Sequence, residues 1–240
     1  MMKKNYNHCK LLWTGGWDST YQLLKMIFYN NVKVIPFYII DEDRQSSFVE
    51  LLTMRCIKNK IINSYPEKAN LISETSLFLK SDIRNDAHIN YAFSKIRKKN
   101  YIGSQYEWIA QFCFQKNISD LHLCIHQDDK ARIILTDKVV KDASNNYRVD
   151  NKYSDTNEYT LFKYFTFPIF DLTKKEMIFD LNHDEYNKIM NLTWFCHNPQ
   201  KNMKPCGVCN ACLYTIEEGL GYRISFYNRI RSYVLKKIKR

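Results

Sequence analysis

Apolar residues occur along the chain in short runs that alternate with longer amphipathic stretches. Residues 10–13 and 32–40 are largely apolar, as expected of strands covered on both faces of a parallel sheet. Between them, residues 18–30 place four apolar side chains on one helical face, namely Leu23, Leu24, Ile27 and Phe28. A strand, a helix and a second strand within about 30 residues indicate a βαβ unit.

Three further helix starts are predicted where Ser or Thr is followed three positions later by Glu, because each side chain can then cap the other residue's backbone amide. The pairs are Ser47 with Glu50, Ser104 with Glu107, and Thr173 with Glu176. Apolar runs at 71–74, 121–125 and 165–170 are interpreted as additional strands. This alternation predicts an α/β fold with a doubly wound parallel sheet. Residues 80–100 and 127–160 are more polar, and we interpret them as insertions or mobile loops.

Composition narrows the class of protein. Of the 240 residues, 45% are hydrophobic and 25% are charged, which excludes a disordered, collagen-like or coiled-coil chain. No apolar run reaches the roughly 18 residues of a membrane span, and the polar first residues lack the apolar centre of a signal peptide. We therefore expect a soluble, cytoplasmic protein that makes no membrane contact.

The net charge of +11 is unevenly distributed, because residues 229–240 contain basic side chains and no acidic ones. The same tail carries an apolar stripe at helical spacing, formed by Ile230, Tyr233, Val234 and Ile238. This pattern favours an amphipathic helix that docks on its own fold or on a second copy in a homodimer. Contact with a nucleic acid stays open as the alternative.

The segment from Thr14 to Thr20, with the sequence TGGWDST, joins the first strand to the first helix. Two glycines at a helix N-terminus let backbone amides point at one oxyanion, and the hydroxyls of Thr14, Ser19 and Thr20 add donors. The segment is neither a Walker loop nor a dinucleotide turn. Asp18 would repel a phosphate unless Mg²⁺ lies between them. The alternative is a simple Gly-Gly turn in which Asp18 caps the helix.

Four of the eight cysteines lie close together with the spacing C-x9-C-x2-C-x2-C, namely Cys196, Cys206, Cys209 and Cys212. Four sulfurs satisfy a tetrahedral Zn²⁺ and leave no open position, so the predicted ion is structural. Zinc is favoured over an iron-sulfur cluster and over disulfides. His197 could replace Cys196 as a ligand, but we interpret it as a bystander. The remaining cysteines are expected to be buried small hydrophobic residues: Cys9, Cys56, Cys113 and Cys124.

The glycine turn resembles the S-G-G-x-D-S signature of PP-loop ATP pyrophosphatases, with Thr14 in place of the leading Ser. The resemblance implies that the pyrophosphate end of ATP is held by Thr14, Gly15, Gly16, Asp18, Ser19 and Thr20. It implies catalytic roles for Asp18, on the Mg²⁺ side, and for Ser19. It also implies that adenine meets the end of the second predicted strand at Tyr38 and Ile39.

Together with the cysteines, the turn makes the chain similar to the 7-cyano-7-deazaguanine synthase family of queuosine biosynthesis. Three segments extend the resemblance: 41–45 (DEDRQ), 167–176 (FPIFDLTKKE) and 193–196 (TWFC). It implies a PP-loop ATP-binding domain over residues 1–180 and a zinc-binding subdomain with a basic tail over 181–240. The implied ligase adenylates 7-carboxy-7-deazaguanine and converts it with ammonia to the amide and nitrile, releasing AMP and pyrophosphate.

Two positions depart from the family pattern. Gly103-Ser104-Gln105-Tyr106 stands where the family has an Arg-Asn pair, and His126 stands where a small residue is usual. Both lie where a pocket at the strand ends would form, so a divergent acyl substrate or acceptor stays open. The alternatives are an enzyme that joins an adenylated deazaguanine to tRNA or to a protein amine, and a module that senses nucleotides without catalysis.

Overall fold

A five-stranded parallel sheet forms the centre of the molecule. The computed structural model describes residues 8–180 and 184–238, and within them the strand order is β3-β2-β1-β4-β7. The strands are β1 (His8–Leu12), β2 (Lys33–Ile40), β3 (Ser76–Leu79), β4 (Leu121–His122) and β7 (Phe165–Thr166). From β1 the chain builds outward to β3, then returns to add β4 and β7 on the other side of β1. This arrangement confirms the predicted doubly wound α/β fold.

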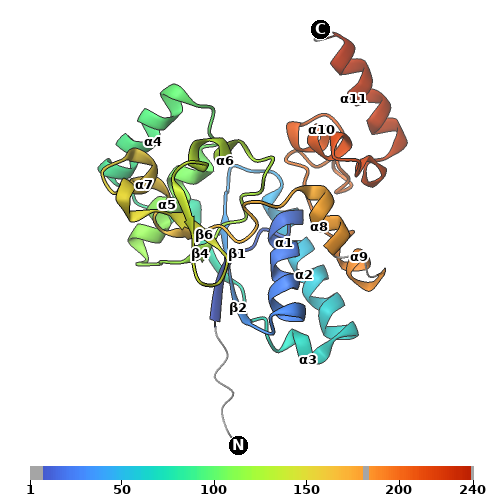
Figure 1. Cartoon of the computed structure of the whole chain (residues 1–240). Helices are drawn as coiled ribbons and strands as arrows, with labels where there is room; N and C mark the ends of the chain where they lie inside the picture. The colour runs from blue at the N-terminus through green and yellow to red at the C-terminus, as the bar shows by residue number, and fades with distance from the viewer. Residues whose placement is uncertain (1–7, 181–183, 239–240) are drawn as a thin grey trace, which may run out of the picture.

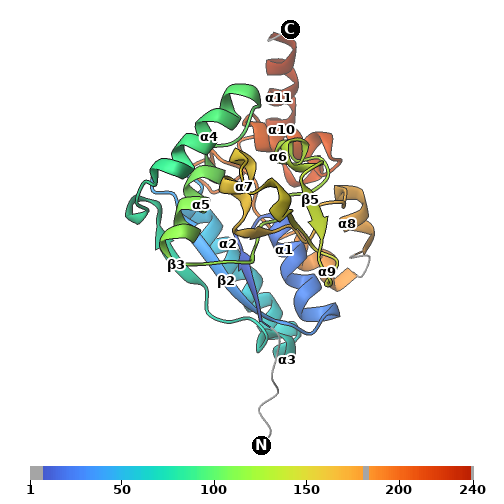
Figure 2. The same cartoon turned by 60° about the vertical axis from the view of Figure 1, so that its left-hand side comes forward.

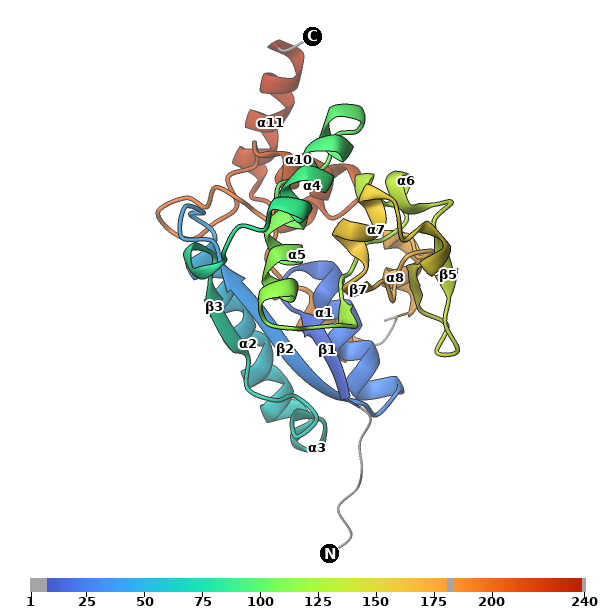
Figure 3. The ribbon, with the colours of Figure 1, turned by 90° about the vertical axis from the view of Figure 1, so that its left-hand side faces the viewer.

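Helices cover both faces of the sheet (Figure 1). One face carries α1 (Trp17–Leu24), α2 (Ser47–Ser64) with the short α3 (Pro66–Ala69), α8 (Lys174–Asp180) and α9 (Asp184–Met190). The other face, turned toward the viewer in Figure 3, carries α4 (Ala87–Lys99), α5 (Gln105–Gln115) and α7 (Asn157–Phe162). Beside it lie α6 (Lys130–Leu135) and an antiparallel hairpin of β5 (Val139–Lys141) and β6 (Tyr147–Val149).

The alternation of side chains along β1 divides the core into two layers. Leu11 belongs to the layer beneath α1 and α2, whereas Leu12 belongs to the layer beneath α4, α5 and α7. The predicted helix at 18–30 is confirmed as α1 followed by a π-helical turn, η1 (Lys25–Tyr29). Its predicted apolar face is buried as expected, with Leu23, Leu24 and Ile27 fully inaccessible and Phe28 partly buried.

Three predictions of secondary structure are wrong. The polar segment 80–100 contains α4, whose apolar residues at Ile89, Phe93 and Ile96 are buried against the sheet. The segment 127–160 is also ordered, because it contains α6, the β5-β6 hairpin, a 3-10 turn, η3 (Asn151–Tyr153), and most of α7. The strand predicted at 71–74 is β3, a few residues later, and Ile72 makes only an isolated bridge with Val34.

One of the three predicted capping boxes forms. Thr173 N donates to the Glu176 carboxylate at 2.7 Å, and Glu176 N donates to Thr173 Oγ1 at 3.2 Å. Ser104 begins α5 without a side-chain cap. Ser47 instead donates from its hydroxyl to the Asp41 carbonyl at 2.7 Å, which joins the start of α2 to the end of β2.

The chain ends in α10 (Asn210–Glu217), a 3-10 turn, η4 (Gly221–Arg223), and α11 (Phe226–Ile238). Figures 1 and 2 show α10 beyond the carboxyl ends of the strands and α11 projecting from it. Ile230 and Tyr233 of the predicted apolar stripe are 47% and 62% exposed, so this face is not buried against the chain's own fold, and its docking on a second copy stays a prediction. The side chains of Val234 and Ile238 lie outside the described residues.

The four cysteines outside the cluster differ in burial. Cys9 and Cys113 are buried and Cys124 is partly buried, but Cys56 is exposed on α2, where a buried residue was predicted. Over residues 8–180 and 184–238, none of the helices combines the length and the apolar composition that a bilayer crossing requires.

Candidate functional site

A cavity of about 360 Å³ lies at the carboxyl ends of the strands, next to the point where the strand order reverses. The loop after β1, the end of β2 and the segment after β4 each contribute to its wall. The segment between α9 and α10 closes it with Trp194, Phe195 and His197. This inner cavity therefore joins the α/β core to the cysteine-containing segment.

The loop after β1 is fixed from both sides. Gly15 has a φ of +69°, and a Cβ there would lie 3.1 Å from Met54 Cγ and 3.3 Å from the Glu50 carbonyl, so any other residue would be strained in its backbone and crowded against α2. Its carbonyl accepts a hydrogen bond from Trp194 N at 2.9 Å. The Ser19 hydroxyl accepts from Thr14 N at 3.3 Å across the loop. The first N–H groups of α1 have no partner within the helix, which suits this end to an anion.

The structure brings most of the predicted nucleotide-binding residues to the inner cavity. Its wall contains Thr14, Gly16, Asp18, Ser19, Tyr38 and Ile39. Gly15 does not line the cavity, because it packs against α2. Thr20 is fully buried, and its hydroxyl accepts a hydrogen bond from the Trp13 indole at 3.1 Å. The position of Thr20 thus gives no support to its predicted contact with phosphate.

Asp18 forms an ion pair with Lys174, the first residue of α8. Lys174 is buried, whereas the Asp18 side chain is 27% exposed, so the ammonium is shielded from water and the carboxylate is only partly shielded. Burial opposes ionisation of Asp18, but the Lys174 ammonium, His126 and hydrogen bonds outweigh it and hold the pKa of the carboxyl below its usual value. Lys174 thus supplies a counter-charge for Asp18 from this chain, a role that the sequence had suggested for Mg²⁺ alone.

Another buried carboxylate lies at the end of β2. Glu50 accepts hydrogen bonds from Tyr38 Oη at 2.8 Å and Ser46 Oγ at 2.6 Å, and Arg44 lies 3.5 Å away. Burial and the adjacent Glu50 carboxylate raise the pKa of the Tyr38 phenol, which stays a donor at neutral pH. This network fixes the side of the cavity where the sequence predicts adenine.

A larger outer cavity of about 1100 Å³ adjoins the inner one. Asp18, Lys174, His126 and Glu218 line both cavities. His126 Nδ1 accepts a hydrogen bond from Asp128 N at 3.2 Å, and burial raises the pKa of Glu218 above its usual value. Gln105, one of the two departures noted in the sequence, also lines both cavities.

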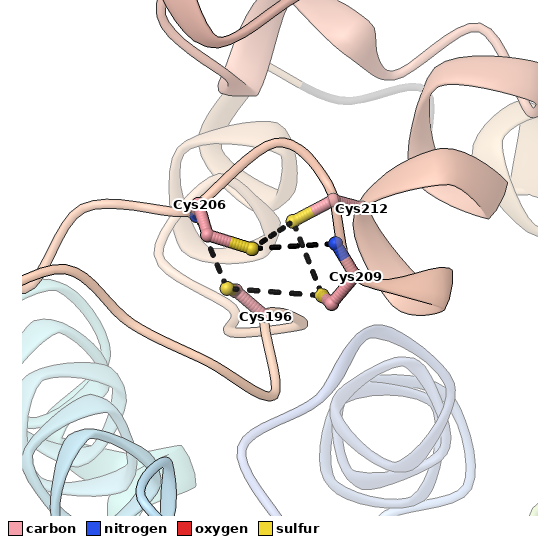
Figure 4. A group of neighbouring side chains, drawn as sticks. All are labelled: Cys196, Cys206, Cys209 and Cys212. Carbon is pink, nitrogen blue, oxygen red and sulfur yellow. Dashed lines mark hydrogen bonds between the residues drawn. The ribbon is translucent and has the colours of Figure 1, made fainter. Parts of the chain in front are cut away.

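The four predicted metal ligands converge on one point (Figure 4). Their sulfurs all lie within 4.8 Å of one another, and the shortest hydrogen-bonded pair, Cys209 and Cys212, is 3.5 Å apart. Disulfides are absent from this cluster, because all four thiols are free. Backbone amides donate to the sulfurs of Cys196 and Cys206, as they do in thiolate sites. The donor set fits a tetrahedral metal ion such as zinc.

The pKa values of the clustered thiols are also consistent with a cation-binding site. Hydrogen bonding with Cys196 and Cys212 lowers the pKa of Cys209, and hydrogen bonding with Cys209 raises the pKa of Cys196 to about 12. Without a cation, therefore, the cluster accommodates one thiolate more readily than several. His197 lies one residue beyond Cys196 but lines the cavities and is not part of the sulfur cluster.

Short contacts connect the cysteine cluster to the inner cavity. The Trp194 indole donates to the Cys196 carbonyl at 2.7 Å, and the Trp194 backbone amide donates to the Gly15 carbonyl at 2.9 Å. Gly207, between two of the ligands, has a φ of +78°, and a Cβ there would lie 2.5 Å from the Asn228 carbonyl of α11. The metal-ligating turn, the cavity wall and the start of α11 thus form one packed unit.

Sequence reasoning missed Lys174, Glu218 and Arg223 as cavity residues. Lys174 had a usable signal, because it follows the capping Thr173 and starts a helix after the last strand, where side chains reach the carboxyl edge of the sheet. Glu218 and Arg223 follow the cysteines along the chain, and no motif marked them.

Comparison with known proteins agrees with this geometry. A family model described as queuosine biosynthesis protein QueC matches residues 10–220 of the 240, a span that includes the loop after β1 and all four clustered cysteines. Among curated proteins, no sequence matches the chain significantly. Because the family match covers well over half of the chain, the protein belongs to the QueC family of queuosine biosynthesis proteins.

Proposed function

We propose that the protein is an ATP-dependent ligase that adenylates the carboxylate of 7-carboxy-7-deazaguanine and converts it with ammonia to the nitrile. The observation that carries this proposal is the Asp18–Lys174 pair, which lies at the first turn of α1 on the wall between the two cavities. A nucleotide in the inner cavity and an acid in the outer one would meet at this pair.

Different residues of the chain would bind the phosphates, the adenine and the Mg²⁺ of the nucleotide. The amides at the start of α1 and the hydroxyls of Thr14 and Ser19 would hold the phosphates, with Lys174 neutralising charge on the oxygens. Tyr38 and Ile39 would border the adenine. Mg²⁺ bound with ATP would offset charge on the departing pyrophosphate, and Asp18 is the carboxylate placed to contact it. A zinc ion on the four cysteines would hold the C-terminal segment, 181–240, over the site.

The chemistry needs two activations. In the first, a carboxylate oxygen attacks the α-phosphorus, the bond to the β-phosphate breaks, and pyrophosphate leaves. Ammonia then displaces AMP to give the amide and releases a proton. In the second, the amide oxygen is adenylated in the same way, and loss of AMP and of both protons on the amide nitrogen gives the nitrile. Glu218 and His126, on the wall of both cavities, are the groups placed to accept these protons.

Pyrophosphate release from ATP and Mg²⁺, with and without the acid and ammonium, tests the proposal. Release should require the acid, and mass spectrometry should detect the nitrile. Asp18→Ala should reduce release by about 100-fold or more, whereas Asp43→Ala, at a side chain that is 94% exposed, should leave it unchanged. ATP binding without any release would instead indicate a nucleotide-sensing module.

A second candidate is an enzyme that joins the adenylated deazaguanine to tRNA or to a protein amine. The observation that favours it is the size of the outer cavity and its two lysines, Lys130 and Lys175, of which Lys130 lies 4.3 Å from the centre of the exposed Tyr101 ring. A salt-dependent affinity for tRNA, absent from a ligase of small molecules, would support this candidate.

A further inference from the structure

Arg223, the last residue of η4, lies between two aromatic rings at the wall of the inner cavity. Its guanidinium carbon is 5.5 Å from the centre of the Trp17 ring and 4.9 Å from that of Phe195. Nη2 donates to the carbonyl of Thr193 and, at 3.0 Å, to its hydroxyl. These contacts hold the guanidinium in place beside the first residue of α1.

Within residues 8–180 and 184–238, no carboxylate forms an ion pair with the Arg223 guanidinium. Lys174 and Arg44, the other cations of the inner cavity, pair with Asp18 and Glu50. For Arg223, by contrast, the described residues provide no carboxylate partner. Burial lowers the pKa of the guanidinium to about 10, so it stays charged at neutral pH. A partly buried cation without a counter-ion is costly, unless a bound anion completes the site.

The surroundings of Arg223 are also rich in donors. The Trp17 indole Nε1–H is buried and has no acceptor among the described residues. The positive end of the α1 dipole lies at the same place, because Trp17 begins that helix. A guanidinium, an unpaired indole N–H and a helix N-terminus all favour an anion, and none of them favours a neutral ligand.

We propose that Arg223 binds a phosphate oxygen of the nucleotide that occupies the inner cavity. The site is then completed by a residue from the C-terminal segment, more than 200 positions after the loop it faces. The inference rests on the proposed function only in taking ATP as the ligand, and the identity of the acid does not enter it.

Calorimetric titration with ATP and Mg²⁺, with pyrophosphate and with adenosine tests the role of Arg223. Arg223→Gln should weaken the binding of ATP and pyrophosphate by about tenfold or more and change that of adenosine by less than twofold. Arg223→Lys, which keeps the charge, should give an intermediate loss. The matched control is Arg229→Gln, because Arg229 is exposed on α11 and lies 5.8 Å from the Phe226 ring, outside both cavities.

Each other result rejects the assignment in a different way. Unchanged ATP and pyrophosphate binding in Arg223→Gln would show that no phosphate contact exists. An equal loss for adenosine would show that Arg223 has only a structural role. If the wild-type protein binds pyrophosphate but releases none with this acid, the proposed reaction fails while the role of Arg223 stands.

Discussion

His122 is a partly buried titratable residue outside the candidate site. Its Nδ1 lies 3.2 Å from Cys9 Sγ and 3.3 Å from Gln22 Nε2, between β1 and α1. Desolvation by burial lowers the pKa of His122 from 6.5 to about 4. The native imidazole is therefore neutral at a pH where an unfolded chain would bind a proton.

The stability of the protein should accordingly depend on pH. Between about pH 6.5 and pH 4 the unfolded state binds more protons than the native state, so the free energy of unfolding falls as the pH is lowered. The loss from His122 is about 3 kcal/mol over this window. Denaturant titrations at several pH values should show a shallower slope for His122→Gln and an unchanged one for the exposed His88→Gln. Equal slopes in all three proteins would contradict the assignment.

At the residue scale, the sequence predicted which side chains lie together where a short motif sets the geometry. The four cysteines and the loop after β1 are local in sequence, so spacing alone brought their members together. The partner of Asp18 is 156 positions away, and only the closure of the sheet places Lys174 beside it. Spacing also could not show that Thr20 faces the Trp13 indole, because adjacent residues of a helix point in different directions.

At the scale of elements, α4 shows why composition misleads. The helix is rich in Lys and Arg, yet Ile89, Phe93 and Ile96 recur on one buried face. Its start was marked by Asp86, whose carboxylate accepts hydrogen bonds from the amides of His88 and Ile89 at 3.0 and 2.9 Å. A cap followed by this periodicity would have predicted the helix, whereas average polarity concealed it.

The caps of α4 and α5 provide a matched test. Asp86→Ala should lower the free energy of unfolding by about 1 kcal/mol, because two amides of α4 lose their acceptor. Ser104→Ala should cost much less, because the Ser104 side chain makes no capping bond at the start of α5. Chemical denaturation of both variants measures the difference. Equal losses would mean that the Asp86 bonds contribute nothing to stability.

At the scale of the whole molecule, the order of the strands was the part that the sequence could not supply. Alternating strands and helices predict a doubly wound sheet but leave open which strand lies at its centre. In the structure β1 is central, and the ends of β1, β2 and β4 meet at one edge. The domain division at residue 180 stays a prediction, and contacts such as Trp194 N to the Gly15 carbonyl cross it.

Because those contacts cross the division, loss of the metal site should weaken binding at the nucleotide site. Cys212→Ser removes one of the four ligands, so the zinc content and the melting temperature of the purified protein should both fall. The Trp194 and Arg223 contacts depend on the same segment, and the dissociation constant for pyrophosphate should rise about tenfold. Cys56→Ser, at an exposed thiol on α2, should change none of these quantities. If zinc is lost from Cys212→Ser while pyrophosphate binding is unaffected, the cysteine cluster stabilises only the C-terminal segment and does not support the inner cavity.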